Sequence, residues 1–351
     1  MGPTGPARLL VGANWIGDAV MSLPMLRSLR RSSPQARLVV WARRGPASVY
    51  RASGLANEVL VAPRSALAAR RLRPQRFDES WLVPNSFRSA VAAFFAGARE
   101  RIGYDTDGRG FLLTHRLPPP PRTLHQLRDY DALLSSRGIA PDLGPPRLDP
   151  AAGALEAARR HLAEAFGTVP PEPPAFLAPG AAFSWTKRWP AERFGLLARA
   201  LLERGIPCGV VIGPGEEGLA REVCAASGAA LAVLGAALDP EGLAALFSLG
   251  RLLVGNDSGP SHLAAAVGTP VVCFFGPTDP GRTEASGSRV RALDRYVFCS
   301  PCFLKTCPYR HECMEEIGVE DALRAIETVL GAAGTRNSEL GPSSWTRVPS
   351  L

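Results

Sequence analysis

The sequence has very little lysine, few aromatic residues and no long basic run. Only two lysines, Lys187 and Lys305, stand among 40 basic residues, so arginine supplies nearly all of the positive charge. Aromatic residues make up 7% of the chain. An arginine-rich nucleic-acid-binding module would need a basic stripe interleaved with aromatic side chains. We therefore expect no nucleic-acid partner.

Membrane-spanning and targeting signals are also missing. No apolar run approaches the roughly 20 residues that cross a bilayer, and the N-terminus lacks the basic start and long apolar core of a signal peptide. These absences predict a cytoplasmic protein whose seven cysteines stay reduced. The net charge of +8 favours an anionic partner such as a phosphate or an acidic membrane face.

Length and periodicity indicate an α/β protein with two domains. A chain of 351 residues, 46% hydrophobic and 21% charged, is long for one core. Short apolar runs alternate with longer amphipathic segments, and a proline cluster at 170–174 is the best linker candidate. We expect an N-terminal domain at 1–168, a C-terminal domain at 175–333 and a disordered polar tail at 334–351. Two such domains would leave a ligand cleft between the carboxyl ends of their parallel sheets.

The expected elements alternate in both halves of the chain. The apolar runs fit buried strands, and the segments between them fit helices with one apolar face. Strands are predicted at 8–12, 37–42, 80–84, 176–178, 209–212, 246–254 and 271–275, and helices at 18–31, 89–98, 191–204, 216–227 and 261–267.

The most informative stretch is GNDSGPSHLAAA, from Gly255 to Ala266. It joins an expected strand to an expected helix. Asp257 and Ser258 favour helix N-caps, and Gly259 lets the backbone come close to a ligand. Such a turn directs free N–H groups and the positive end of a helix dipole at one spot, which suits a phosphate. The alternative is an ordinary capped helix in which His262 makes a structural contact.

Two other turns carry candidate residues. In NWIGDAV, at 14–20, Asp18 should begin a helix and is either a general base or simply the helix N-cap. In SWTKRWP, at 184–190, Thr186 and Lys187 are suited to hold a pyrophosphate, and the next arginine is a second possible cation. The alternative for this turn is a solvated loop whose two tryptophans pack inward.

Six motifs in this order resemble glycosyltransferase family 9, the bacterial lipopolysaccharide heptosyltransferases. The NWIGD and PNSFRSA segments look like the branch that adds the second heptose, whereas Ser261-His262 resembles the branch that adds the first. Another GT-B nucleotide-sugar enzyme, such as an epimerase, would share the donor turn but should lack PNSFRSA and RIGY. The motifs are NWIGDAVMSLP (14–24), PNSFRSA (84–90), RIGYDTDGRGFLLT (101–114), KRWP (187–190), GNDSGPSHLAAA (255–266) and GPT (276–278).

The resemblance implies a GT-B fold, in which two Rossmann-like domains with parallel sheets face each other across a cleft. It also implies inverting, metal-independent transfer of L-glycero-D-manno-heptose from ADP-heptose to the heptose of the lipopolysaccharide inner core, with Kdo as the alternative acceptor. Such an enzyme needs no cofactor and would make peripheral contact with the inner face of the inner membrane.

The resemblance further implies roles for individual residues. Asp18 would be the catalytic base. Asn14, Arg88 and Arg109 are candidates for binding the lipid A–Kdo–heptose acceptor. The donor-binding candidates are Thr186, Lys187, Glu216 (with Glu217 as the alternative register), Asp257, Ser258, Gly259 and His262.

A cysteine cluster lies outside that chemistry. Cys299, Cys302, Cys307 and Cys313 fall within 15 residues. In a reducing compartment, such spacing suggests a structural zinc ion or an iron–sulfur cluster. Buried free thiols, or a disulfide formed on purification, are the alternatives.

Overall fold

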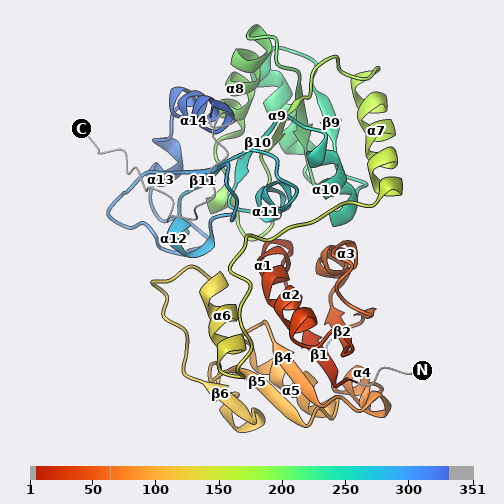
Figure 1. The fold of residues 1–351 in the computed structure, drawn as a ribbon. Coiled ribbons are helices and arrows are strands. Elements are labelled where there is room, and N and C mark those ends of the chain that lie inside the picture. The colour runs from red at the N-terminus through yellow and green to blue at the C-terminus, as the bar shows by residue number, and fades with distance from the viewer. Residues whose placement is uncertain (1–4, 64, 332–351) are drawn as a thin grey trace. The chain divides into compact units, whose positions relative to one another are not determined.

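The computed structural model describes residues 5–63 and 65–331, and the predicted tail at 334–351 lies outside them. The chain divides into two compact units, residues 1–149 and 150–351. Each unit is built on one six-stranded, fully parallel sheet with helices (Figure 1). The α/β class predicted from the alternation of short apolar runs and amphipathic segments is therefore confirmed.

The first unit has the strand order β3-β2-β1-β4-β5-β6. Its central strands β1 and β4 are almost completely buried, as the continuous apolar runs of a parallel sheet require. The strands are β1 (Ala7–Val11), β2 (Arg37–Ala42), β3 (Glu58–Val61), β4 (Glu79–Leu82), β5 (Glu100–Tyr104) and β6 (His115–Leu117). The helices are α1 (Ile16–Met21), α2 (Leu23–Ser32), α3 (Arg44–Ala52), α4 (Ala66–Arg70), α5 (Phe87–Phe95) and α6 (Leu127–Ser135), with 3-10 turns η1 (Arg73–Gln75) and η2 (Gly110–Leu112).

The second unit has the strand order β12-β11-β10-β7-β8-β9. If the strands of each unit are numbered from its own first strand, both sheets have the order 3-2-1-4-5-6, so the two sheets have the same topology. The strands are β7 (Ala175–Ala178), β8 (Cys208–Val211), β9 (Ala232–Leu234), β10 (Leu252–Asn256), β11 (Val271–Phe275) and β12 (Val290–Asp294). The helices are α7 (Ala152–Phe166), α8 (Ala191–Glu203), α9 (Glu217–Ser227), α10 (Pro240–Ser248), α11 (Gly259–Ala266), α12 (Pro280–Thr283), α13 (Glu312–Glu315) and α14 (Val319–Gly331), with the 3-10 turn η3 (Trp185–Lys187).

Most predicted elements differ from the observed ones by a few residues at their ends, and two differ in kind. The expected helix at 18–31 is two helices, because the chain turns at Ser22 and α2 restarts with Pro24 in its first turn. The apolar run at 246–254 is not one strand: Leu246 to Ser248 end the buried helix α10, and β10 begins at Leu252. Periodicity alone does not separate a buried helix end from a buried strand.

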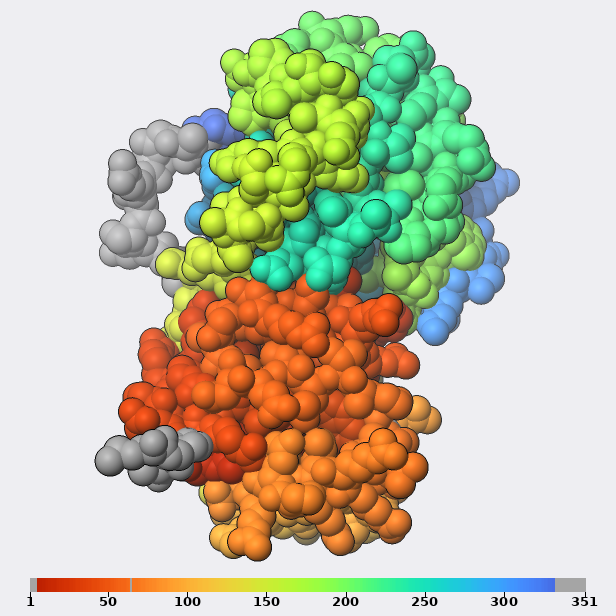
Figure 2. All heavy atoms as spheres, turned by 90° about the vertical axis from the view of Figure 1, so that its right-hand side faces the viewer, coloured from red at the N-terminus to blue at the C-terminus, as the bar shows by residue number. Residues whose placement is uncertain are grey.

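The division between the units falls at Asp149 and Pro150, earlier than the expected domain end at residue 168. The reason is α7, which packs against α10 and β9 of the second unit. In Figure 2 the yellow-green residues of α7 lie directly on the teal and green surface of that unit. The proline cluster at 170–174 therefore connects α7 to β7 inside the second unit.

Candidate functional site

Both sheets change their winding direction between two neighbouring strands, β1 and β4 in the first unit and β7 and β10 in the second. Ligands of doubly wound sheets bind at the carboxyl ends of such strands. In the second unit these ends lead into Pro179-Gly180 and into Asn256-Asp257. The turn predicted to hold a phosphate thus lies where this fold places a ligand.

Asn256 fixes the geometry of this turn and is fully buried. Its Nδ2 donates to the carbonyl of Pro179 at 2.8 Å, and its Oδ1 accepts from the backbone N–H of Trp189 at 2.9 Å. One side chain therefore joins the loops after β7, η3 and β10. Asn256 was not among the predicted site residues, although a polar residue at the end of a buried strand, directly before Asp257, was a usable signal.

Trp189 holds the KRWP segment in place. Its ring stacks on Phe274 with centroids 4.2 Å apart, and its Nε1 donates to the carbonyl of Ile317 at 2.9 Å. Trp185, by contrast, is 48% exposed. Only one of the two tryptophans is therefore a core anchor, and that anchor sets the position of Lys187 two residues before it.

Lys187 and Asp257 form a buried ion pair. Lys187 Nζ lies 2.5 Å from Asp257 Oδ2, and the two side chains are 13% and 5% exposed. Asp257 Oδ2 also accepts from the hydroxyl of Thr278 at 2.8 Å, and His262 Nε2 lies 4.0 Å from the other carboxylate oxygen. The structure thus brings together Lys187, Asp257 and His262, three of the predicted donor-site residues.

The N-terminus of α11 presents an unsatisfied hydroxyl. Ser258 occupies the N-cap position, but its side chain makes no capping bond, and its buried Oγ has no hydrogen-bond partner. Gly259 is the first helical residue, and Pro260 after it has no N–H to satisfy. Among the described residues, only two other buried side-chain polar atoms lack a partner, and one of them is Arg188 Nε. A buried hydroxyl without a partner is costly unless a ligand completes it.

Glu216 and Glu217 have different surroundings. The Glu216 carboxylate accepts from the backbone N–H of Gly213 at 2.9 Å and lies 3.9 Å from Arg188. It packs so closely on Gly180 that a Cβ there would lie 2.2 Å from Glu216 Oε2. Glu217 is exposed and accepts only from Gly215 in its own turn. Of the two registers left open by the sequence, the structure brings Glu216 to the end of β7.

Thr186 is placed differently from expectation. Its hydroxyl pairs with the carbonyl of Leu304 at 2.8 Å and with the hydroxyl of Ser184 at 2.7 Å, and the residue is 1% exposed. His311 Nε2 lies 2.6 Å from its carbonyl oxygen. The Thr186 side chain therefore joins η3 to the loop at 296–310 rather than pointing to the Lys187 ammonium.

In the first unit, Asp18 lies in the first turn of α1 and is half-buried. Its Oδ1 accepts from Gln126 Nε2 at 3.1 Å, and the same amide donates to Tyr130 at 2.8 Å. Burial, reinforced by the charge of Asp18, raises the pKa of Tyr130 well above its usual value. Residue 15, not Asp18, is the N-cap of α1, so the N-cap interpretation of Asp18 is wrong. Sequence reasoning missed Gln126 and Tyr130, which lie more than 100 positions away.

The expectation that Arg109 binds the acceptor is wrong in this structure. Arg109 is completely buried and donates to the carbonyls of Tyr104, Pro84 and Ser86 and to the side chains of Ser89 and Asn85. Burial lowers the pKa of Arg109 to about 10, against the opposing effect of Asp107 and Asp105. The guanidinium N–H groups of Arg109 therefore bind the PNSFRSA segment and the carbonyl of Tyr104.

The two other acceptor candidates are accessible. Arg88 is exposed in the first turn of α5. Asn14 is half-buried in the loop between β1 and α1. Both follow strands at the winding switch of the first unit, Asn14 after β1 and Arg88 after β4.

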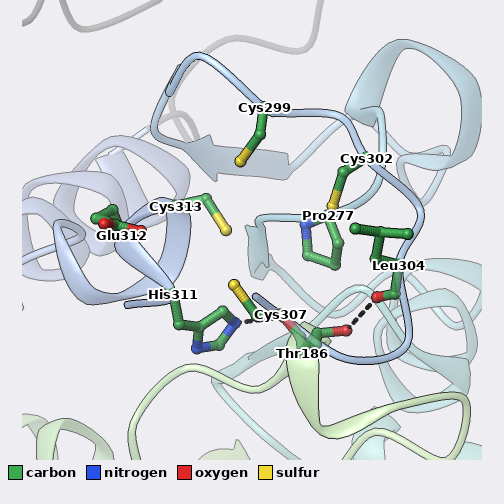
Figure 3. A pocket seen from close by; sticks show the side chains of 9 residues that line it. All are labelled: Thr186, Pro277, Cys299, Cys302, Leu304, Cys307, His311, Glu312 and Cys313. Carbon is green, nitrogen blue, oxygen red and sulfur yellow. Dashed lines mark hydrogen bonds between the residues drawn. The ribbon is translucent and has the colours of Figure 1, made fainter. Parts of the chain in front are cut away.

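The four clustered cysteines line one pocket of the second unit, together with Thr186, Pro277, Leu304, His311 and Glu312 (Figure 3). All four are free thiols. Burial raises the pKa of Cys313 to about 12, and Cys299, Cys302 and Cys307 act in the same direction. Among the described residues, no three Cys, His, Asp or Glu side chains already form a metal-ligand set.

Comparison with known proteins agrees with this architecture. The chain is 29% identical to lipopolysaccharide heptosyltransferase 2 of Salmonella typhimurium over 303 residues, covering 81% of this chain and 87% of that protein. The solved E. coli ADP-heptose LPS heptosyltransferase II superposes with a TM-score of 0.79 at 24% identity, covering 94% of this chain and all of that one. An E. coli heptosyltransferase solved with ADP-2-deoxy-2-fluoro heptose gives a TM-score of 0.70 at 18% identity, covering 92% of this chain and 99% of that one.

Two doubly wound units, each built on one parallel sheet, and the superposition on the E. coli structure define a protein of the GT-B fold class. The family model for glycosyltransferase family 9 (heptosyltransferase) matches residues 66–312. The chain belongs to glycosyltransferase family 9, the heptosyltransferases. Among the described residues, no helix is both long and apolar enough to cross a membrane.

Proposed function

We propose that this chain transfers L-glycero-D-manno-heptose from ADP-heptose to the heptose of the lipopolysaccharide inner core. The observation that carries the proposal is the anion site of the second unit, where the Lys187 ammonium and the partnerless Ser258 hydroxyl lie at the switch between β7 and β10. Similarity to heptosyltransferase 2 over 81% of the chain supports the choice of donor and acceptor.

The donor site acts on the leaving group. As the bond between the anomeric carbon and the pyrophosphate oxygen breaks, ADP leaves with the bonding electrons and gains negative charge. Lys187, Arg188 and the first N–H groups of α11 meet that charge, with Ser258 Oγ donating to a phosphate oxygen. These groups supply the positive charge without a catalytic metal. Asp257 orients Lys187, and Asp257 with His262 contacts the sugar or phosphate.

The acceptor site supplies the base. Asp18 takes the proton from the attacking sugar hydroxyl, whose oxygen forms the new bond on the face of the anomeric carbon opposite ADP, so the transfer inverts configuration. Gln126 Nε2 donates to Asp18 Oδ1 and so orients the carboxylate. Asn14 and Arg88 are the acceptor contacts that we retain, and the acceptor brings the enzyme into peripheral contact with the inner membrane.

The test is ADP release from ADP-heptose with two acceptors, lipid A–Kdo carrying one heptose and the same molecule carrying none. Turnover only with the heptose-bearing acceptor supports the proposal. Turnover only with the bare Kdo acceptor would reassign the chain to the first-heptose reaction, which Ser261-His262 and a 36% identity over 125 residues to heptosyltransferase 1 of Pseudomonas aeruginosa favour. ADP binding without turnover on either acceptor would contradict both.

A further inference from the structure

In the segment between β12 and α13, residues 295–311, most large aromatic side chains are exposed and the cysteine side chains are more buried. The segment contains no helix or strand, and its large apolar residues face outward: Phe298 is 78% exposed, Tyr296 68% and Tyr309 51%. Within the fully described stretch from 301 to 310, only Cys302 and Cys307 are not exposed. Apolar packing in the segment is limited to Val297, which contacts the core of the second unit, and to the exposed rings of Phe298 and Tyr309, whose centroids lie 4.9 Å apart.

The cysteines converge from different parts of this segment. Cys299 and Cys302 lie on one arm, Cys307 on the returning arm, and Cys313 on α13. Figure 3 shows their thiol groups turned toward the same pocket, with His311 and Glu312 on its edge. His311 is already engaged, because its Nε2 lies 2.6 Å from the Thr186 carbonyl. Sulfur is therefore the donor type that this pocket offers.

The backbone of the segment is strained at two points. Phe303, directly after Cys302, has φ of +57°, and His311, two residues before Cys313, has φ of +64°. Left-handed backbone is unfavourable for residues other than glycine and persists only where the surroundings enforce it. Hydrogen bonds to neighbouring segments hold both points: the N–H of Phe303 donates to the carbonyl of Pro277 at 2.7 Å, and His311 Nε2 lies 2.6 Å from the carbonyl oxygen of Thr186.

We propose that Cys299, Cys302, Cys307 and Cys313 bind one structural metal ion as four thiolates, with Zn²⁺ as the expected ion. A C-x-x-C pair with two further cysteines is the ligand set of closed structural zinc sites. Binding displaces the four thiol protons to solvent and involves no change of oxidation state. The described side chains do not form a metal-ligand set as they stand, so binding would require the four cysteine side chains to rotate toward one point of the pocket they line. The ion then cross-links both arms of the loop to α13.

The metal site also positions η3. The loop accepts hydrogen bonds from Ser184 Oγ through the carbonyl of Lys305, and from Thr186 Oγ1 through that of Leu304, both within 2.8 Å. His311 contacts the Thr186 carbonyl from the other side. The turn that carries Lys187 is thus held between two arms of the cysteine segment. This part of the inference rests on the proposed donor site, whereas metal binding itself does not.

The test begins with the full chain purified without chelator and analysed for metals. We expect about one zinc per chain, and its loss in Cys302→Ser and Cys307→Ser, whose thiols are half-buried and replaceable without a large cavity. Cys224→Ser is the matched control, since Cys224 is also half-buried but lies on α9, outside the pocket. Iron in the same stoichiometry, lost in the same variants, would support the site with another metal.

Two readouts on the native sequence are independent of whether the variants fold. Co²⁺ exchanged into the chain should give the intense thiolate-to-metal absorption of a tetrahedral sulfur site. Removing the metal should change the fluorescence of Trp185, whose ring lies 5.1 Å from that of His311, and should expose residues 296–310 to protease. Less than a tenth of an equivalent of any metal, together with no Co²⁺ absorption, would overturn the proposal. ADP affinity and turnover are measured separately, so failure of the donor-site proposal is distinguishable.

Discussion

At the scale of single residues, the pair formed by Lys187 and Asp257 carries the most weight. Both side chains are nearly excluded from water, and removing one partner of a buried pair leaves an uncompensated charge at a cost of about 3–5 kcal/mol. The composition of the sequence already singled out Lys187, because a strong bias toward arginine had left only two lysines. Local motifs could not predict that Lys187 pairs with Asp257, because the two residues lie 70 positions apart in the sequence.

Replacing Lys187 should weaken ADP binding. Charge-assisted hydrogen bonds contribute about 1.5–3 kcal/mol, so we expect Lys187→Met to raise the Kd for ADP about 10- to 100-fold by calorimetry. In the double variant Lys187→Met/Asp257→Asn, no unpaired buried carboxylate remains at position 257. Comparing it with Lys187→Met therefore separates the loss of ADP binding from the loss of stability. Lys305→Met, at the exposed second lysine, is the control, and equal affinities for the two lysine variants would exclude Lys187 from the donor site.

Asp18→Asn should lower turnover with little effect on ADP affinity. A general base contributes about 10²–10⁴-fold, and asparagine keeps an oxygen acceptor for Gln126, which preserves the local packing. Steady-state kinetics with saturating acceptor measure the loss, and ADP calorimetry checks that the donor site is intact. A decrease of less than about tenfold would exclude the role of base.

At the scale of elements, the segment from Pro84 to Ser89 shows how a buried cation shapes a loop. Arg109 and Arg88 were equivalent candidates in the sequence, since both follow motif residues of the first half. The structure separates them completely: Arg109 is 0% exposed with five acceptors, and Arg88 is exposed. Burial of an arginine depends on the loop that folds over it, and no local pattern reports that.

Arg109→Met should therefore destabilise the first unit, and Arg88→Met should not. Leaving several buried carbonyls without donors costs about 3 kcal/mol or more, which corresponds to a fall in Tm of order 10 °C for a unit of this size. Arg109→Lys should not restore stability, because an ammonium lacks the planar fork that reaches all five acceptors. Thermal unfolding by circular dichroism measures the change, and equal Tm values for Arg109→Met and Arg88→Met would contradict this account.

Buried strands that form bounded apolar runs were predictable, whereas β3, β5, β6, β9 and β12 were not predicted. The strands at 37–42 and 271–275 were predicted to the residue, because both are bounded apolar runs that a parallel sheet buries on both faces. Breaks caused by packing were not predictable. The turn at Ser22, the end of α10 and the attachment of α7 to the second unit all depend on contacts with distant elements.

At the scale of the whole molecule, charge is divided unequally between the units. Residues 1–149 hold 22 arginines and 11 acidic residues, whereas residues 150–351 hold 18 basic and 21 acidic ones. The overall charge of +8 therefore hides a strongly basic first unit and a slightly acidic second unit. Attraction to an anionic bilayer is worth about 1 kcal/mol for each basic residue near its surface and is screened by salt.

We expect the chain to sediment with vesicles containing anionic lipid at low salt and to be released at high salt. Neutral vesicles are the first control. Arg43→Gln/Arg44→Gln, two exposed positions of the first unit, should weaken binding several-fold, whereas Arg221→Gln/Arg251→Gln, two exposed positions of the second, should have little effect. Equal losses in the two double variants would show that the charge division does not orient membrane binding.

The shared winding of the two sheets has a consequence for how this enzyme can change over evolution. In each unit, the candidate residues leave the sheet after its first and fourth strands: Asn14, Asp18 and Arg88 in one, Lys187, Asp257 and Ser258 in the other. In the proposed function, each substrate is therefore bound by two loops of a separate unit that has its own sheet. In the proposed function, mutations in the loops of one unit leave the sheet of the other unit intact. Acceptor preference can therefore change among relatives while the nucleotide-sugar donor stays the same.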